Sequence, residues 1–394
     1  MISARQLFFR YLAPTSYSPV ALEIEKAGGC WLYSPDGKKY LDLISGISVS
    51  NIGHNNSDVI DAIRVQLDKH MHLMVYGELI QSPQVKLAEK LCSLIPETLN
   101  SVFYTGSGSE AVEGALKLAR RFTGRHEIVA FRNAYHGSTM GALSVTGNET
   151  HKRAFRPLVP SVRHIDFNST RCLDQISSAT ACVITEPVQG EAGVMLPERE
   201  FLKKLKSRCK ETGALLIFDE IQTGFGRTGT FFAMDRYKII PDIVLFAKAL
   251  GGGMPIGAFV SSKEIMEAFC SNPALGHITT FGGHPVSCAA AIASLDYIMN
   301  NSLCDNAMEI GGIIKEMLVH PEIVAVRGEG LMLAIELKTP GMVRKVIDIC
   351  LHKGLLTDWF LFNDRCIRVC PPLIINREEA LFACRTILAS LDEL

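Results

Sequence analysis

Short, uninterrupted apolar runs alternate along the middle of the chain with longer segments in which apolar residues recur every three or four positions. The runs occupy residues 101–105, 127–131, 181–185, 214–218, 242–247 and 256–260. Residues 111–122 are an example of the helical period between them. Continuous apolar strands separated by helices are typical of a parallel or mixed sheet that helices cover on both faces. The pattern therefore predicts an α/β fold with a mostly parallel central sheet.

The two ends of the chain have a different pattern. Residues 31–43, WLYSPDGKKYLDL, predict a β-hairpin because two strand-like arms flank a Pro-Asp-Gly turn. After residue 290, helical segments enclose the runs VAVRGEGLMLAIEL and CIRVCPPLII. We therefore predict a large domain at residues 51–289 and a smaller α+β domain built from residues 1–50 and 290–394.

Composition narrows the possible classes of protein. The chain has 394 residues, is 47% hydrophobic, and carries 40 basic against 41 acidic residues, a balance that favours neither nucleic acid nor an anionic membrane as partner. No apolar run approaches the ~20 residues that span a bilayer, and the first residues lack a signal-peptide pattern, which predicts a cytoplasmic protein. The 12 cysteines include no C-x-x-C pair, so buried thiols are favoured over disulfides or a metal site.

Lys248 follows the apolar run 242–247 and precedes a run of three glycines. A lysine at the end of a strand is commonly just solvated. Alternatively it is a nucleophile, because burial lowers the pKa of the amine and frees its lone pair for reaction with a carbonyl group. This residue alone leaves both interpretations open.

The segment 105–121, TGSGSEAVEGALKLARR, follows an apolar run and opens a helix. Ser107 and Glu110 have capping-box spacing, and a glycine-rich helix N-terminus is suited to bind a phosphate. An ordinary capped helix is the alternative. The G-x-G-x-x-A pattern also fits a dinucleotide fingerprint, but that requires an acidic residue after the next strand, where Arg132 stands instead.

The apolar run 214–218 ends directly in two acidic residues, Asp219 and Glu220. We interpret Glu220 as a surface acid that caps a helix. A buried carboxylate at Asp219 needs a cationic partner, and a protonated pyridine nitrogen would serve. A phosphate cradle, a strand-end aspartate and a strand-end lysine together match the needs of a phosphorylated pyridine aldehyde.

At this point the chain resembles the class III (ω-amino-acid) aminotransferases, the pyridoxal-phosphate enzymes that include acetylornithine, ornithine and 4-aminobutyrate aminotransferases. The resemblance spans nearly the whole chain, through YSPDGKKYLDLISG, GSGSEAVEGALKLAR, AYHGSTMGALSVTG, EPVQGEAGV, FDEIQTGFGRTG, FAKALGGGMPIGA, HITTFGGHP and RVCPPL. It implies a fold-type I transferase that moves an ω-amino group to a keto acid, with 2-oxoglutarate expected, by a ping-pong mechanism. Racemisation, aminomutation or decarboxylation on the same scaffold, and a catalytically silent binding protein, are the alternatives.

The resemblance also implies which residues bind the cofactor, pyridoxal 5′-phosphate. These are Ser107, Gly108, Ser109, Tyr135, His136, Glu186, Asp219, Gln222, Lys248 and Thr280. Lys248 would be the Schiff-base lysine and Asp219 the partner of the pyridinium nitrogen. Gln222 would contact the 3-oxygen, and Tyr135 would stack on the ring. Thr280 would reach the phosphate of the neighbouring subunit, which implies a homodimer with active sites at the interface.

Three further positions concern the substrate. Arg368 resembles the arginine that binds the carboxylate of the keto acid, and Glu191 resembles the acid that pairs with this arginine when an ω-amino substrate binds. Ser138 stands where these aminotransferases typically have an arginine. The donor therefore either lacks a second carboxylate or meets another cation, for which Arg132 and Arg153 are candidates. We expect acetylornithine to be a weaker donor than amines without an α-carboxylate.

Overall fold

A computed structural model describes residues 2–198 and 200–394. A seven-stranded central sheet has the strand order β4-β10-β9-β8-β7-β5-β6. Its strands are β4 (Ser101–Thr105), β5 (Glu127–Phe131), β6 (Val162–Ile165), β7 (Thr180–Thr185), β8 (Leu215–Asp219), β9 (Ile243–Phe246) and β10 (Gly257–Ser261). Strands β5 to β9 pair in parallel, and β10 runs antiparallel to β4 and β9, so the predicted, mostly parallel sheet is confirmed.

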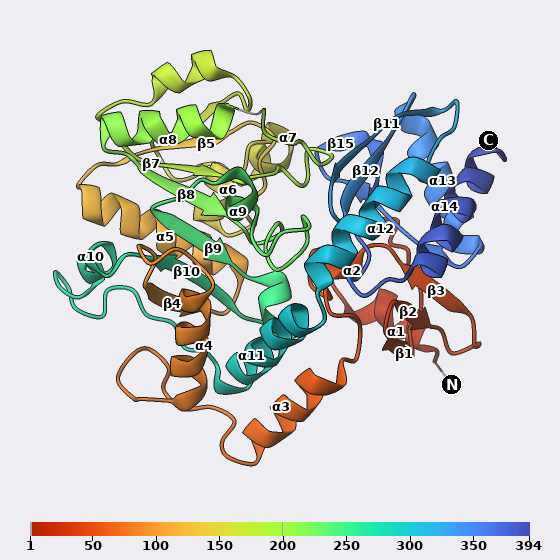
Figure 1. Cartoon of the computed structure of the whole chain (residues 1–394), viewed down its shortest axis with the longest axis horizontal. Coiled ribbons are helices and arrows are strands. Elements are labelled where there is room, and N and C mark those ends of the chain that lie inside the picture. Colours follow the sequence, from red (N-terminus) through yellow and green to blue (C-terminus); the bar gives the residue numbers. More distant parts are fainter. Residues whose placement is uncertain (1, 199) are drawn as a thin grey trace.

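Helices cover both faces of the central sheet because its strands are apolar on both sides (Figure 1). In β8, Phe218 packs into the apolar cluster on one face of the sheet, and the preceding residue, Ile217, packs into the cluster on the other face. One face is covered by α5 (Gly108–Thr123) and α6 (Met140–Val145). Buried residues of α3 (Ser57–Leu67), α4 (Ser82–Ser93), α8 (Phe201–Thr212) and α11 (Pro285–Asn300) belong to the cluster on the other face.

The first and last parts of the chain lie together beside the central sheet (Figure 1). One sheet contains β1 (Lys26–Gly28), β2 (Trp31–Tyr33), β3 (Lys39–Asp42) and β13 (Leu355–Leu356); the other contains β11 (Ile323–Glu329), β12 (Met332–Leu337), β15 (Asn363–Val369) and β14 (Trp359–Phe360). Helices α12 (Leu303–Met317), α13 (Pro340–His352) and α14 (Arg377–Leu391) accompany them. The predicted hairpin is present, and β3 pairs in parallel with β13. The proposed domain limits remain a prediction, and the limit at 289/290 falls within α11.

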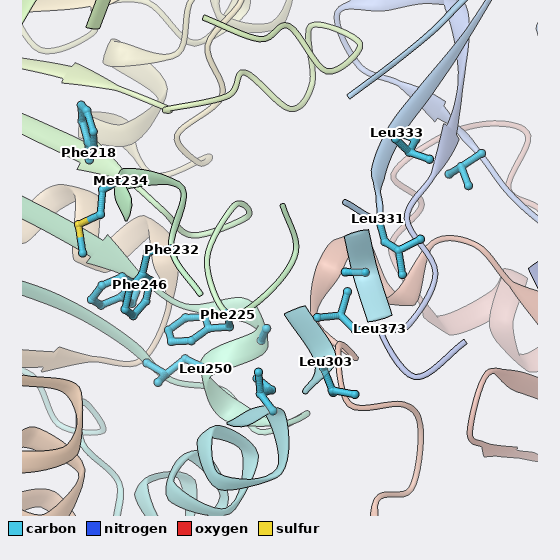
Figure 2. Close-up of a cluster of buried hydrophobic side chains, with 14 of the residues drawn as sticks. Phe218, Phe225, Phe232, Met234, Phe246, Leu250, Leu303, Leu331, Leu333 and Leu373 are labelled. Atoms are coloured by element: carbon cyan, nitrogen blue, oxygen red, sulfur yellow. The ribbon is translucent and has the colours of Figure 1, made fainter. Parts of the chain in front are cut away.

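A continuous apolar cluster joins these terminal parts to the central sheet. Figure 2 shows members of this cluster from the two parts: Phe218, Phe225, Phe232, Met234, Phe246 and Leu250 from the middle of the chain, and Leu303, Leu331, Leu333 and Leu373 from its C-terminal part. The remaining helices of the described residues are short: α1 (Ala4–Tyr11), α2 (Ser45–Ser48), α7 (Glu149–Lys152), α9 (Ala233–Tyr237), α10 (Lys263–Met266), and the 3-10 helices η1 (Arg153–Phe155), η2 (Thr170–Gln175), η3 (Lys248–Gly251) and η4 (Glu267–Phe269). Within the described ranges, no helix has the length and apolarity that crossing a membrane requires.

Arg227 ties the same parts together through polar contacts. Its guanidinium is fully buried in the segment between β8 and α9. Nη1 donates to the carbonyl oxygens of Leu331 (2.9 Å) and Pro371 (2.6 Å), and Nη2 donates to Ser45 Oγ (3.2 Å) and Asn51 Oδ1 (2.5 Å). One side chain therefore links the N-terminal part, the central part and the C-terminal part of the chain.

Candidate active site

A cavity of about 400 Å³ opens where β8 and β9 end and α5 begins. Nine of the predicted site residues line it: Ser107, Gly108, Ser109, Tyr135, His136, Glu186, Asp219, Gln222 and Lys248. Ligands gather at the carboxyl ends of strands in open α/β sheets, because the loops there leave a crevice. The fold thus brings these residues together from segments that are far apart in the sequence.

The N-terminus of α5 forms one end of the cavity. Ser107 caps the helix by accepting a hydrogen bond from the N–H of Glu110 (3.3 Å). The Glu110 carboxylate turns back to the N–H of Gly106 (2.7 Å) and not to that of Ser107, so only half of the predicted capping box forms. The first N–H groups of a helix have no intrahelical partner and, with the helix dipole, favour an anion. This end of the cavity is therefore suited to a phosphate group.

Gly137 allows the next segment to lie against this helix end. Its φ is 126°, and a Cβ atom there would stand 2.2 Å from Ser109 Oγ. A larger residue would push the neighbouring loop, with Tyr135 and His136, away from the cavity wall. Glycine is therefore required for both the backbone conformation and the close approach.

Asp219 and His136 form a buried pair in the wall of the same cavity. Asp219 ends β8, its Oδ2 lies 2.7 Å from His136 Nδ1, and its Oδ1 accepts the N–H of Ile221 (3.1 Å). The carboxylate is thereby fixed at the cavity wall, where it can hold a protonated ring nitrogen. Nearby, Glu186 accepts the N–H groups of Tyr135 (2.9 Å) and Gly190 (3.0 Å), and burial raises the pKa of its carboxyl to about 7.

Lys248 follows β9 as the first residue of η3, with a left-handed φ of 48°. Burial lowers the pKa of its amine, against the opposing influence of the carboxylates of Glu191, Asp219 and Glu186. The nucleophile interpretation of Lys248 is therefore favoured over a solvated lysine. Gln222 also lines the cavity, and its buried Nε2 has no hydrogen-bond partner within the described part of the chain.

These groups match the chemistry of pyridoxal phosphate. The helix end is suited to the phosphate, the Asp219 carboxylate to the ring nitrogen, and the Lys248 amine to the aldehyde. The unpartnered Nε2 of Gln222 is a donor available for an oxygen of the ring. The residues present therefore fit this cofactor.

Arg368 and Glu191 form a buried ion pair, the pairing that the resemblance implies for the binding of an ω-amino substrate. Arg368 lies on β15, and its Nη2 donates to both carboxylate oxygens of Glu191 at 3.0 Å. A second acid, Asp358, was not predicted from the sequence; its Oδ1 accepts a hydrogen bond from Arg368 Nε at 2.7 Å. Asp358 lies in the link between β13 and β14, and no motif spacing connects it to Arg368. Arg368 Nη1 has no partner among the described residues.

Comparison with known proteins decides the family. The model of the class III aminotransferases matches residues 12–391. The chain belongs to this family. It is 41% identical to an acetylornithine aminotransferase of Archaeoglobus fulgidus over 365 residues, 92% of this chain and 94% of the relative. It is 37% identical to a putrescine aminotransferase of Pectobacterium atrosepticum over 377 residues, 91% of this chain and 80% of the relative.

The solved structures agree with the fold. An amine transaminase from an uncultivated Pseudomonas species, solved in its PLP-bound form, superimposes with a TM-score of 0.91 at 29% identity, covering 98% of each chain. The protein is thus a pyridoxal-phosphate-dependent aminotransferase with a fold-type I architecture. The dinucleotide interpretation of the segment 105–121 is wrong.

The aminotransferase departs from the sequence-based prediction at Glu220. We predicted a surface acid, but its side chain is fully buried. It does cap a helix: its carboxylate accepts the N–H groups of Ala233 (3.1 Å) and Met234 (2.7 Å) at the start of α9, and the hydroxyl of Thr223. Burial raises the pKa of this carboxyl to about 7.

Four predicted site residues lie outside the cavity lining: Arg368 and Glu191, which form the ion pair described above, and Ser138 and Thr280. Ser138 is exposed, and its Oγ lies 3.4 Å from the Tyr135 hydroxyl. Thr280 is exposed in the segment before α11, away from the cavity of its own chain. Of the two candidate cations near Ser138, Arg132 is paired with Asp166 at 2.8 Å, and Arg153 is exposed in η1.

Proposed function

We propose that this aminotransferase moves the ω-amino group of an amine or amino acid to 2-oxoglutarate by a ping-pong mechanism. The supporting observation is the Arg368–Glu191 pair beside the Lys248 cavity. A buried guanidinium with an internal carboxylate partner can be neutral towards one substrate and available to the carboxylate of another. One site can therefore accept two unlike substrates in turn.

The chain's residues would hold the cofactor at both ends. When bound, pyridoxal phosphate supplies an aldehyde that condenses with amines and a ring that draws electrons from the adjacent carbon. The N-terminus of α5 binds its phosphate, and the Asp219 carboxylate keeps the ring nitrogen protonated. His136 orients Asp219 through the 2.7 Å contact, and Gln222 donates Nε2 to the ring oxygen.

Lys248 would move the proton. Because burial lowers the pKa of its amine, more of the neutral form is present near neutral pH. The neutral Nζ can take a proton from the substrate carbon, and the ammonium that results can then donate that proton. The surrounding carboxylates stabilise the ammonium that forms for that interval.

Arg368 would distinguish the two half-reactions. With an ω-amine donor, the Arg368–Glu191 pair remains closed, and the donor meets no free cation there. When the keto acid enters, its carboxylate replaces that of Glu191 on Nη2 and reaches the unpartnered Nη1. Asp358 stays on Nε throughout, so the guanidinium keeps its orientation.

We also propose a homodimer in which Thr280 serves the active site of the partner subunit. Large apolar side chains near Thr280 are exposed, including Phe281 and Ile278, and Ile80 is 96% exposed. Such clustered apolar surface is typical of a protein interface.

We also propose a cytoplasmic location, which is supported by the free state of all 12 cysteines.

Two experiments test these proposals. A donor alone should bleach the yellow colour of the enzyme, and 2-oxoglutarate should restore it. If none of the 2-oxo acids that are added restores the colour, a racemase, aminomutase or decarboxylase is favoured.

For the dimer, Lys248→Ala and Thr280→Ala subunits are mixed after partial unfolding and refolding. Each hybrid contains one intact site, so the mixture should exceed both parents in activity at limiting cofactor. A mixture no more active than its parents contradicts the shared site.

A further inference from the structure

The turn at residues 361–363, between β14 and β15, is fixed against the segment that carries Glu191. The N–H of Leu361 donates to Glu191 Oε2 (2.9 Å), and the N–H of Phe362 donates to the Glu191 carbonyl oxygen (3.1 Å). Asn363 Nδ2 donates to the carbonyl oxygen of Ala192 (3.1 Å). These three hydrogen bonds fix the backbone from which the Phe362 side chain extends.

The Phe362 ring lies beside the cavity wall. Its centroid is 6.2 Å from that of Tyr135, which lines the cavity, and 5.0 Å from that of His151, edge to face. The Tyr135 hydroxyl in turn lies 3.4 Å from Ser138 Oγ. An aromatic surface therefore adjoins the position where related aminotransferases typically carry an arginine.

The charged groups around this surface do not replace that arginine. Ser138 is neutral, the Arg132 guanidinium is paired with Asp166 at 2.8 Å, and Arg153 is exposed in η1. Arg368 is already held by two carboxylates, those of Glu191 and Asp358. A carboxylate at the far end of a donor would therefore lose water without gaining a buried cation here, which is unfavourable. An apolar chain would gain contact with the two rings.

We propose that Phe362 and Tyr135 form the binding surface for the far end of the amino donor. The preferred donors are then primary amines with an apolar or aromatic tail, and amines that end in a carboxylate are poorer. This inference rests on the proposed transfer of an amino group and names its substrate class. Phe362 acts as a specificity residue, because it contacts the tail and not the reacting carbon.

The test compares pentylamine, propylamine and 5-aminopentanoate as donors to 2-oxoglutarate, with kcat/KM measured for each. In the wild type, two additional methylenes on the aromatic surface should favour pentylamine over propylamine about tenfold. Phe362→Ala should reduce that ratio to about threefold or less and leave propylamine unchanged. Leu361→Ala is the matched control: its side chain is exposed, its N–H still binds Glu191, and the ratio should not change.

A second variant tests the charge argument. Ser138→Arg should raise kcat/KM for 5-aminopentanoate relative to pentylamine about tenfold, because it supplies the missing cation. The inference is overturned if Phe362→Ala lowers all three donors by one factor, or if the wild type prefers 5-aminopentanoate to pentylamine. If the wild type transfers an amino group from none of the three, the inference also fails; the proposed function fails separately, if no donor bleaches the yellow colour or no 2-oxo acid restores it.

Discussion

Glu191→Gln should tighten the binding of the keto acid, because Glu191 occupies the nitrogen that the substrate carboxylate needs. Both Glu191 oxygens lie 3.0 Å from Arg368 Nη2, and both side chains are buried, at 5% and 1% exposure. Opposite charges at this separation attract by about 5–6 kcal/mol at an effective dielectric constant near 20, and desolvation offsets most of this. We expect a net competition of about 1–2 kcal/mol, equivalent to a five- to thirtyfold lower KM for 2-oxoglutarate.

The assay is steady-state kinetics at saturating donor, with KM for 2-oxoglutarate as the readout. Asp358→Asn is the matched control, since Asp358 binds the same guanidinium through Nε and does not compete for Nη2. Its KM for 2-oxoglutarate should change much less. If Glu191→Gln leaves KM unchanged or raises it, the exchange of carboxylates on Arg368 is refuted. Equal decreases in both variants would mean that removal of charge, and not competition, is responsible.

Two further predictions concern stability. Arg227→Met should lower the free energy of unfolding in urea by at least about 3 kcal/mol, because four buried oxygen acceptors lose their donor; Arg227→Lys should lie between, and a loss below about 1 kcal/mol would contradict this role. Glu220 has a carboxyl pKa of about 7 when folded, above its unfolded value, so its ionisation makes the folded state lose stability as pH rises from 6 to 8. Glu220→Gln should remove about 1 kcal/mol of that loss in urea titrations at the two pH values, and an unchanged pH dependence would contradict the pKa.

The sequence predicts the central sheet well where the strands are buried on both faces. The apolar runs 127–131, 181–185 and 242–247 coincide with β5, β7 and β9, with no end displaced by more than one residue. The edge strand β6 was not predicted, because its sequence VRHI has two adjacent polar residues at its centre and only its last residue, Ile165, is buried. The direction of β10 was left open, since an apolar run does not reveal whether it pairs in parallel.

The candidate site was predictable where a residue follows a buried strand. Asp219 is the last residue of β8, and Lys248 begins η3 after the single residue Ala247 that follows β9, so their places at the cavity followed from the strand pattern. Glu220 was predicted at the surface because the pattern does not show that α9 packs over it. Asp358 gave no signal, because its contact with Arg368 depends on how β14 and β15 pair and not on a motif.

The central claim is that Lys248 is the residue that binds the cofactor covalently. Borohydride reduction of the purified, yellow enzyme, followed by proteolysis and mass spectrometry, fixes the cofactor on the lysine that carries it. We expect a single modified peptide, with the added mass on Lys248, and no such peptide from Lys248→Ala. A label on another lysine, such as the buried Lys152, or no label at all, would contradict it.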